Sequence, residues 1–299
     1  KLGHGQTEAH PYHTGAVKFA ELVDQYTEGR VKIEIYPNAT LGAERDMVEG
    51  CQMNTVDICI TTNAPLTNFD AKFNVYEFPY LFETRDEAHK IMDGQIGQDL
   101  LDDLTSINIK GLAYFENGFR NVTNDVKPIV TVSDLAGMKI RTMESAYHMA
   151  HFNALGANAI PMAFSEVFTA LQQGTVDGEL LGYDALHNSG RWEVDKFFLQ
   201  TDHNHTVIFA FMNRKFWDGL SKEEQRLILE AAREAERLEY AYNRDVVRRG
   251  EEFVRGKNVT IHKLSPEERE RMKRMTASIY DRFDSIDPEL LRLIRETQK

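Results

Sequence analysis

The sequence has few cysteines, with only Cys51 and Cys59 in 299 residues. Neither their number nor their spacing matches a zinc-binding pattern. The surrounding residues place Cys51 on a helix and Cys59 on the strand that follows. We therefore expect two small buried thiols, and a bridge between them is the less favoured alternative.

The chain is also poor in positive charge and has no long apolar segment. Lys and Arg number 35 against 47 Asp and Glu, which gives a net charge of −12. Nucleic-acid binding needs clustered cations, so this composition argues against it. No apolar run approaches the roughly 20 residues of a membrane span. Because the first residue is Lys1 rather than methionine, we expect a processed chain whose signal peptide has been removed.

Recognisable catalytic, metal and cofactor motifs are missing as well. There is no G-x-S-x-G elbow, phosphate-binding loop, G-x-G-x-x-G fingerprint or H-E-x-x-H pair. The close pairs His10 with His13 and His203 with His205 lack further ligands at metal spacing. We expect no metal, no cofactor and no enzyme, and keep as an alternative an enzyme with His10 or His205 as general base.

What the sequence does contain is a repeated α/β pattern. A chain of this length exceeds the usual size of one core, so two lobes are expected. The stretches MNTVDICI (53–60) and QGTVDGEL (173–180) follow the same order: helix, Asn or Gly, Thr-Val-Asp, strand. A three-letter match could arise by chance, but the shared order of elements favours two similar α/β lobes.

Capping sequences indicate three helix starts. The stretches Thr84–Glu87, Ser221–Glu224 and Ser265–Glu268 each combine Ser or Thr with a following Glu. From Ser221 one apolar stripe continues to a stop at Gly256, which makes this helix roughly 50 Å long. A helix of that length is expected to lie across both lobes.

Other local patterns predict a strand over 31–36, a helix over about 43–53, and a strand over 55–62. An apolar strand is expected to end at Asn117-Gly118. No Pro- or Ser-rich linker separates the lobes, so we expect the chain to cross near 121–126 and 203–212, forming a hinge over a cleft. We assign residues 1–123 plus 207–252 to lobe I and residues 124–206 plus 253–299 to lobe II.

The stretch MKIRTM (138–143) raises the main functional question, because Arg141 lies near the end of a predicted buried strand. In open α/β sheets, ligands bind beyond the carboxyl ends of parallel strands. An unpaired buried guanidinium would cost several kcal/mol, so it needs an anion. Its planar fork suits a carboxylate. An internal ion pair, or an arginine in water at the strand end, is the alternative.

Two more residues are candidates for the same site. Arg120 follows Asn117-Gly118 at the expected lobe junction, although it could be an ordinary loop arginine. Phe164 begins a predicted helix after a proline turn. An aromatic side chain there could floor a pocket or pack against the helix as a hydrophobic staple.

Four ordered stretches together resemble one known family: HPYHTGAVKFAELVDQYTEGRVKIEIYPNATLG, ENGFRNVTN, DLAGMKIRTM and ALGANAIPMAFSEVFTALQQGTVDG. They are similar to DctP-type solute-binding proteins of tripartite ATP-independent periplasmic (TRAP) transporters. The resemblance implies an α/β, two-lobed fold of the periplasmic-binding-protein kind, with crossing hinge strands and a long helix. It also implies that Arg141 makes the paired contact with a ligand carboxylate, that Arg120 assists, and that Phe164 lines the pocket.

The chain departs from this family after Val-Asp-Gly, where Gln-Glu-Asn-Pro is frequent. Here Leu181 stands in place of the asparagine, which argues against sialic acid and the commonest sugar acids. Glu179 and Asp184 could instead supply a counter-charge for an amine, unless both face away from the pocket. The remaining candidates for the pocket wall are Glu8, Asn63 and Tyr183.

The expected function is capture of a small organic acid (a sugar acid, keto acid or amino acid) and its delivery to TRAP permease subunits. The resemblance places the protein in the periplasm, and we expect a monomer. Two alternatives remain at this stage: a ligand-sensing binding protein for a receptor, and an enzyme acting on a small carboxylate.

Overall fold

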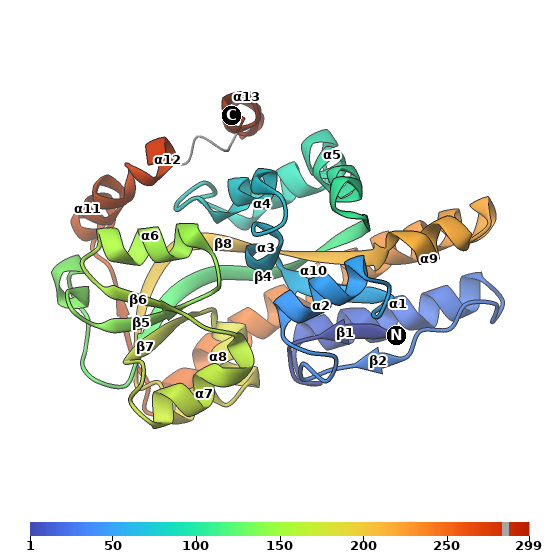
Figure 1. Ribbon diagram of the computed structural model, residues 1–299. Helices are drawn as coiled ribbons and strands as arrows, with labels where there is room; N and C mark the ends of the chain where they lie inside the picture. The colour runs from blue at the N-terminus through green and yellow to red at the C-terminus, as the bar shows by residue number, and fades with distance from the viewer. Residues whose placement is uncertain (283–286, 299) are drawn as a thin grey trace.

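The computed structural model describes residues 1–282 and 287–298 (Figure 1). Its strands are β1 (Leu2–His4), β2 (Ile35–Tyr36), β3 (Ile58–Thr62), β4 (Ile109–Asn124), β5 (Lys139–Thr142), β6 (Asn158–Pro161), β7 (Gly178–Leu181), β8 (Phe197–Asn213) and β9 (Thr260–Lys263). Its helices are α1 (Pro11–Tyr26), α2 (Glu44–Gln52), α3 (Asn63–Leu66), α4 (Arg85–Met92), α5 (Gln95–Asp103), α6 (Ala146–Ala154), α7 (Phe164–Gln172), α8 (Tyr183–Asn188), α9 (Arg214–Gly219), α10 (Lys222–Arg255), α11 (Pro266–Thr276), α12 (Ile279–Arg282) and α13 (Pro288–Thr297). Short 3₁₀ segments are η1 (Ala71–Glu77), η2 (Leu104–Ile107), η3 (Val132–Leu135) and η4 (Arg191–Glu193).

The strands of the described chain form one sheet in the order β2-β1-β3-β8-β4-β7-β5-β6, with β9 beside β8. The long antiparallel strands β4 and β8 run through both halves of the molecule (Figure 1). On one side β3 pairs with residues 208–212 of β8, and on the other β7 pairs with residues 121–124 of β4. The predicted α/β fold with two crossing strands is therefore confirmed.

Each half has an apolar core of its own. Around α1, the core contains Phe19 and Leu22 together with Ile208 of β8. Around β5 and α6, a separate core contains Ile140 and Phe152. The assignment of lobes at 123/124, 206/207 and 252/253 stays a prediction. Along the crossing strands, β4 gains β7 as its neighbour at residue 121, and β8 pairs with β3 from residue 208.

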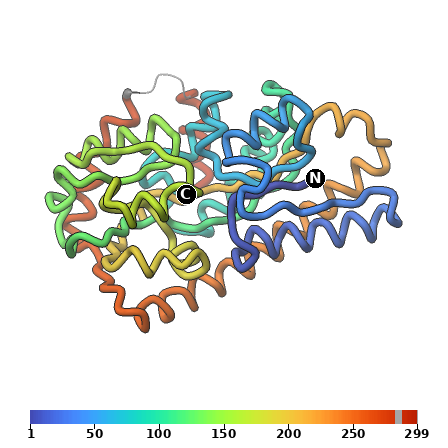
Figure 2. The backbone as a smooth tube through the Cα atoms, turned by 60° about the horizontal axis from the view of Figure 1, so that its bottom comes forward, coloured from blue at the N-terminus to red at the C-terminus, as the bar shows by residue number. Residues whose placement is uncertain are grey.

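Helix α10 joins the two halves along one side, next to α1 (Figure 2). Ser221 begins it by accepting a hydrogen bond from the Glu224 N–H, while the Glu224 carboxylate accepts one from Ser221 N–H. The helix has 34 residues, so it is about 51 Å long. It contacts helix α1 in one half, helix α8 in the other, and the crossing strand β4. The predicted long helix, and the helix starts at Thr84 and Ser265, are confirmed.

Two local predictions need correction. The alternating stretch 31–36 forms a strand only at Ile35–Tyr36, because its partner β1 is three residues long. The strand expected to end at Asn117-Gly118 continues to Asn124. Gly118 has a φ of +73° and lies at a register shift of the β4–β8 ladder, so it marks a bulge within a strand.

The cysteine prediction is confirmed, since Cys51 on α2 and Cys59 on β3 are both buried free thiols. The Cys59 thiol donates a hydrogen bond to the Met47 carbonyl oxygen. Across residues 1–282 and 287–298, none of the helices is both long and apolar enough to cross a membrane.

Candidate ligand-binding cleft

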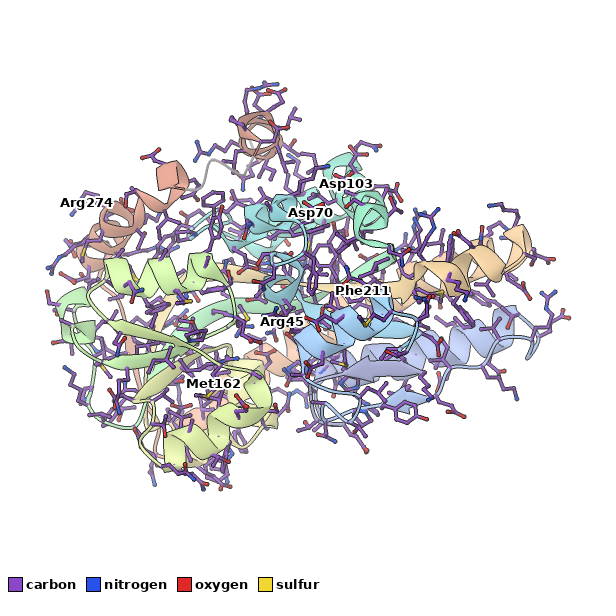
Figure 3. The ribbon with its side chains drawn as sticks, viewed as in Figure 1. Arg45, Asp70, Asp103, Met162, Phe211 and Arg274 are labelled. Carbon is purple, nitrogen blue, oxygen red and sulfur yellow. The ribbon has the colours of Figure 1, made fainter. Side chains whose placement is uncertain are left out.

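A cavity lies where the two halves face each other across the middle of the sheet. In Figure 3, Met162 marks one side of this junction and Arg45 of helix α2 marks the other. The residues that line the cavity come from both halves and are mostly small, polar or charged: Gly5, Gln6, Ala39, Ala43, Glu44, Thr62, Pro65, Asn117, Arg120, Arg141, Met143, Glu144, Met162, Ala163, Phe164, Ser165, Leu181 and Ala185. Three sequence-predicted residues, Arg141, Arg120 and Phe164, are among them.

Arg141 reaches the cavity from β5, and only 3% of its surface is exposed. Its Nε and Nη2 atoms both donate to the Met162 carbonyl oxygen, at 2.9 and 2.6 Å. Burial lowers its pKa to about 10, so the group is still charged at neutral pH. No carboxylate of the described residues forms an ion pair with it. Its remaining N–H groups, on Nη1 and Nη2, are therefore available to an anion in the cavity.

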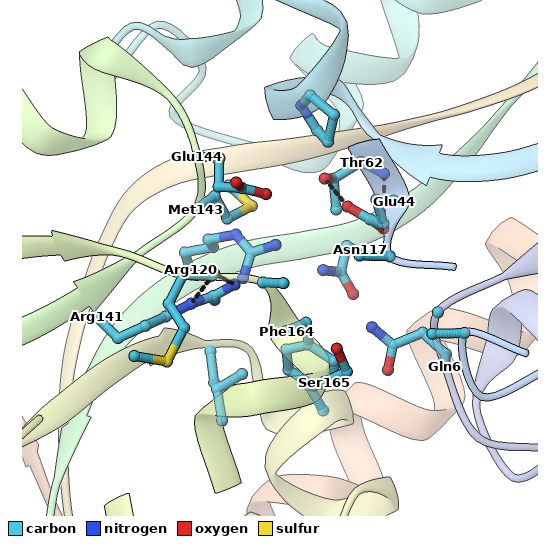
Figure 4. Close-up of a pocket in the computed structure, with 18 residues that line it drawn as sticks. Gln6, Glu44, Thr62, Asn117, Arg120, Arg141, Met143, Glu144, Phe164 and Ser165 are labelled. Atoms are coloured by element: carbon cyan, nitrogen blue, oxygen red, sulfur yellow. Dashed lines mark hydrogen bonds between the residues drawn. The ribbon is translucent and has the colours of Figure 1, made fainter. Parts of the chain in front are cut away.

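Arg120 reaches the same space from the bulged part of β4. Its Nε donates to the Thr206 hydroxyl at 2.6 Å, and its Nη1 donates to the Leu180 carbonyl oxygen at 2.8 Å. With the Asn117 amide oriented to satisfy both of its ends, Arg120 Nη2 donates to the amide oxygen at 3.2 Å. Figure 4 shows the two guanidinium groups beside one another on one side of the cavity. Like Arg141, Arg120 has no carboxylate partner among the described residues.

Phe164 is the first residue of α7, as the sequence predicted. Residues Val167, Ala170 and Leu171 bury one face of this helix, which leaves its first turn at the cavity. The Arg141 Cζ atom lies 5.9 Å from the centre of the Phe164 ring. The aromatic face therefore supports the guanidinium that offers the free N–H groups.

Glu44, which sequence reasoning missed, supplies an acidic group on the opposite wall. It is the first residue of α2, and its carboxylate accepts hydrogen bonds from the Thr62 N–H, at 3.1 Å, and the Thr62 hydroxyl. Burial raises its pKa, and the Thr62 hydrogen bonds and the arginine charges oppose that change. The internal repeat could have found it, because Ala43-Glu44 occupies the place that Ala163-Phe164 occupies in the other unit.

Two acidic residues proposed from the sequence as counter-charges do not line the cavity. Glu179 is fully buried in β7, with its Oε1 atom 3.3 Å from Arg191 Nε. Asp184 is fully buried in α8, where its Oδ2 atom lies 3.4 Å from His10 Nε2. Their charges are already engaged by protein cations or polar groups, so the hypothesis of an amine bound between them loses its basis.

The other predicted wall residues also lie elsewhere. Tyr183 stacks on Phe198, with ring centres 4.3 Å apart, and faces a separate cavity behind the crossing strands. Asn63 is buried, and its amide donates to the Phe73 carbonyl oxygen and to Glu77 Oε1. Glu8 is exposed and is not part of the cavity wall. Leu181 does line the cavity, so this position offers a ligand no hydrogen bond.

The described residues contain no group of three or more His, Cys, Asp or Glu side chains arranged to hold a metal ion. Two α/β halves joined by crossing strands, with a cleft between them that contains two buried arginines, are the architecture of an extracytoplasmic solute-binding protein. The chain belongs to the DctP family, described as bacterial extracellular solute-binding protein family 7, which matches residues 2–286. The predicted membership in the TRAP-transporter solute-binding proteins, and with it the periplasmic location, is confirmed.

Several named relatives support this assignment. The chain is 35% identical, over 79% of its length and 72% of the relative, to the 2,3-diketo-L-gulonate-binding periplasmic protein YiaO of Escherichia coli K12. It is 30% identical to the C4-dicarboxylate-binding periplasmic protein DctP of Rhodobacter capsulatus, covering 94% of this chain and 85% of that one.

Solved structures agree with the fold. The sugar acid binding protein DctPAm of Advenella mimigardefordensis, in complex with galactonate, matches with a TM-score of 0.96 at 30% identity, covering 99% of this chain and 96% of that one. A TRAP periplasmic solute-binding protein of Polaromonas sp. JS666, bound to D-erythronate, matches with a TM-score of 0.93 at 33% identity, covering 98% and 97%. The chain is therefore a TRAP solute-binding protein that captures a small carboxylate.

Proposed function

We propose that the ligand is a polyhydroxylated monocarboxylate of the sugar-acid class, which the protein carries to a TRAP permease. The observation that carries this proposal is the pair of buried guanidinium groups, Arg141 and Arg120, which share one cavity without a carboxylate partner among the described residues. Two buried cations of this kind are stabilised by an anion that enters from solvent.

The charge balance of the cavity favours one carboxylate over two. The positive charges of Arg141 and Arg120 face two half-buried acids that line the same cavity, Glu44 and Glu144. With both acids ionised, one ligand carboxylate brings the cavity to a single excess negative charge. A second carboxylate would add another negative charge beside Glu44, which is costly in a buried site.

The remaining polar groups suit hydroxyl groups, which both donate and accept hydrogen bonds. Glu44 accepts, while Gln6, Asn117 and Ser165 can do either (Figure 4). They compensate for the missing hydrogen bond at Leu181. Solved relatives at 28 to 33% identity were crystallised with galactonate, D-erythronate and D-glucuronate, which are all hydroxylated monocarboxylates.

We also propose that the protein does not turn its ligand over. The two histidines considered as general bases are buried outside the cavity wall, with His10 beside Asp184 and His205 beside Glu116. That the protein is a monomer, or that it also signals to a receptor, stays untested. An amino acid ligand is the second candidate, because Glu44 could pair with an ammonium group.

Mass spectrometry of the small molecule released from freshly purified, denatured protein tests this proposal. Calorimetric titration with galactonate, erythronate, glucuronate, succinate and glutamate provides the second measurement. We expect the hydroxylated monocarboxylates to bind most tightly and to be recovered unchanged after incubation. Preferred binding of glutamate or succinate, or conversion of the bound acid, would contradict the proposal.

A further inference from the structure

We propose that Arg191 is a positioning residue that holds the ligand-binding fork of Arg141 in place through the segment 162–164. Arg191 does not line the cavity, so it cannot contact the ligand there. The inference rests on the proposed function, because it assigns Arg141 as the carboxylate-binding group.

Arg191 is anchored against the first turn of α7. It begins the short segment η4, and 3% of its surface is exposed. Its Nη2 atom donates to the Phe164 carbonyl oxygen at 3.0 Å, and its Cζ atom lies 4.6 Å from the centre of the Phe164 ring. The Phe168 ring, one turn further along α7, lies 5.7 Å from the same Cζ atom. Arg191 therefore fixes both the backbone and the aromatic ring at the start of this helix.

The segment held by Arg191 also holds Arg141. The Met162 carbonyl oxygen accepts from both Nε and Nη2 of Arg141, and Phe164, two residues later, is bound by Arg191. With one edge of the Arg141 guanidinium fixed in this way, the free N–H groups on Nη1 and Nη2 form the fork that faces the cavity. Movement of the segment 162–164 would rotate that fork.

Charge supports the same arrangement. Glu179 lies on β7, next to β5, and it compensates the buried charge of Arg191, whose Nε atom is 3.3 Å from its carboxylate. Arg141 is the next cation that acts on the Glu179 carboxylate. If Arg191 lost its charge, Glu179 would keep its hydrogen bond to Asp195 but lose its ion-pair partner, and Arg141 would be the main remaining cation acting on its carboxylate. The fork would then be drawn from the cavity toward β7.

The test compares Arg191→Met and Arg191→Lys with the wild type, using titration with the tightest ligand of the panel above. Because a misplaced fork loses one charge-assisted hydrogen bond, we expect Arg191→Met to weaken binding by about tenfold or more. Arg191→Lys keeps the charge, so we expect an intermediate loss. Arg214→Met, which removes an exposed arginine paired with Asp218 on α9, is the matched control and should bind like the wild type.

A double-mutant comparison separates positioning from general destabilisation. In an Arg141→Lys background no fork remains, so adding Arg191→Met should change the dissociation constant by less than about twofold. In the pair Arg191→Met with Glu179→Gln, the stray carboxylate is gone, and we expect part of the affinity to return. The proposal is overturned if Arg191→Met binds like the wild type. It is also overturned if the double variant weakens binding by the product of the fold-changes of Arg191→Met and Arg141→Lys.

A measurement without ligand keeps the two proposals distinguishable. In nuclear magnetic resonance spectra of the free protein, the Nε–H signal of Arg141 should be sharp and slow to exchange, because that proton is held by Met162. It should broaden in Arg191→Met or, if that variant does not fold, in Arg191→Lys. An unchanged signal would refute the positioning role. Failure of the wild type to bind any carboxylate would refute only the proposed function.

Discussion

Two α/β units of this protein share one backbone plan and place different side chains at the ligand. The first unit runs from β1 through α2 and β3 to α3, and the second runs from β5 through α7 and β7 to α8. In the first unit the N–H groups of Thr55 and Val56 donate to the Gly50 carbonyl oxygen. In the second, those of Thr175 and Val176 donate to the Ala170 carbonyl oxygen. The repeat predicted from Thr-Val-Asp is therefore present in three dimensions.

The aspartates of the two Thr-Val-Asp stretches also serve the same purpose. Asp57 accepts a hydrogen bond from the backbone nitrogen of Lys1, at the start of β1, and Asp177 accepts one from the Lys139 N–H, at the start of β5. Each therefore fixes the beginning of the neighbouring strand. The equivalence extends to the cavity, where each unit presents the residue at the start of its nine-residue helix.

The difference between the units lies in those helix-start residues. The first unit presents the carboxylate of Glu44, and the second presents the apolar ring of Phe164 beside Arg141. In the proposed function, this one scaffold offers an acceptor for hydroxyl groups on one side and a cationic, aromatic floor for a carboxylate on the other. The proposal therefore places ligand selection in side chains at equivalent positions of a shared backbone.

The largest effect should come from removing the cation of the second unit. Arg141→Ala deletes the N–H fork, and since each charge-assisted hydrogen bond contributes about 1.5–3 kcal/mol, binding should weaken at least about a hundredfold. Titration calorimetry measures this, with Arg214→Ala as the control. Unchanged affinity would show that the second unit does not hold the carboxylate.

The two halves should respond alike to acid, because each buries a neutral histidine. Burial lowers the pKa of His4 on β1 and of His151 on α6 to about 3. At these two sites, between pH 6.5 and about 3, the unfolded chain then binds more protons than the folded one, so their contribution to the free energy of unfolding falls as the pH drops through this window.

Denaturant titrations at pH 7 and pH 5 test this prediction. The loss of unfolding free energy between pH 7 and pH 5 should be smaller in His4→Gln and in His151→Gln than in the wild type, by about 1–2 kcal/mol each. His262→Gln, which changes a less buried histidine on β9, should leave the loss unchanged. A pH dependence that neither of the two buried-site variants reduces would contradict the assignment.

A smaller effect is expected at the helix start of the first unit. Glu44→Gln keeps an accepting oxygen and removes the charge, so binding of galactonate or erythronate should weaken by about threefold to tenfold. A monocarboxylate without hydroxyl groups should lose less. Glu49→Gln, on an exposed part of the same helix, is the control for calorimetry. Equal losses for both kinds of acid would show that Glu44 does not read hydroxyl groups.

A last effect, on stability rather than on binding, should appear in the turns that precede Thr-Val-Asp. Gly174 and Asn54 both have a left-handed backbone, with φ of +67° and +65°. A Cβ at Gly174 meets no atom within 4 Å, so substitution tests backbone strain alone. Gly174→Val should cost about 1–2 kcal/mol and Gly174→Asn much less, because asparagine tolerates this conformation. Urea unfolding that cannot distinguish Gly174→Val from Gly174→Asn would contradict this equivalence of the two turns.

The sequence was sufficient for features that depend on neighbouring residues. Capping residues located α4, α10 and α11, and the repeat located the strand-helix units. The positions of Arg141 and Phe164 followed from where a strand ends and a helix begins. These features arise from local hydrogen bonding and from the period of apolar residues, both of which can be seen along the chain.

The missed features depend on contacts between distant segments. Glu179 does not line the cavity because its carboxylate pairs with Arg191, twelve residues later in the sequence. Asp184 does not line it because its carboxylate lies beside His10, from the other half of the molecule. Glu44 enters the cavity only because Thr62, at the end of β3, holds its carboxylate there. Charged residues carry no periodic signal that tells an internal partner from a ligand.

The crossing strands β4 and β8 pair irregularly on either side of Arg120. The β4–β8 ladder slips between Glu116 and Gly118 and again between Arg120 and Val122. Arg120 therefore lies between two irregular points of the ladder that joins the halves. A bend of β4 at this point would move the Arg120 guanidinium, so a ligand bound to this side chain would be coupled to the bending of the strand. Ligand contact and strand bending would then meet at a single residue.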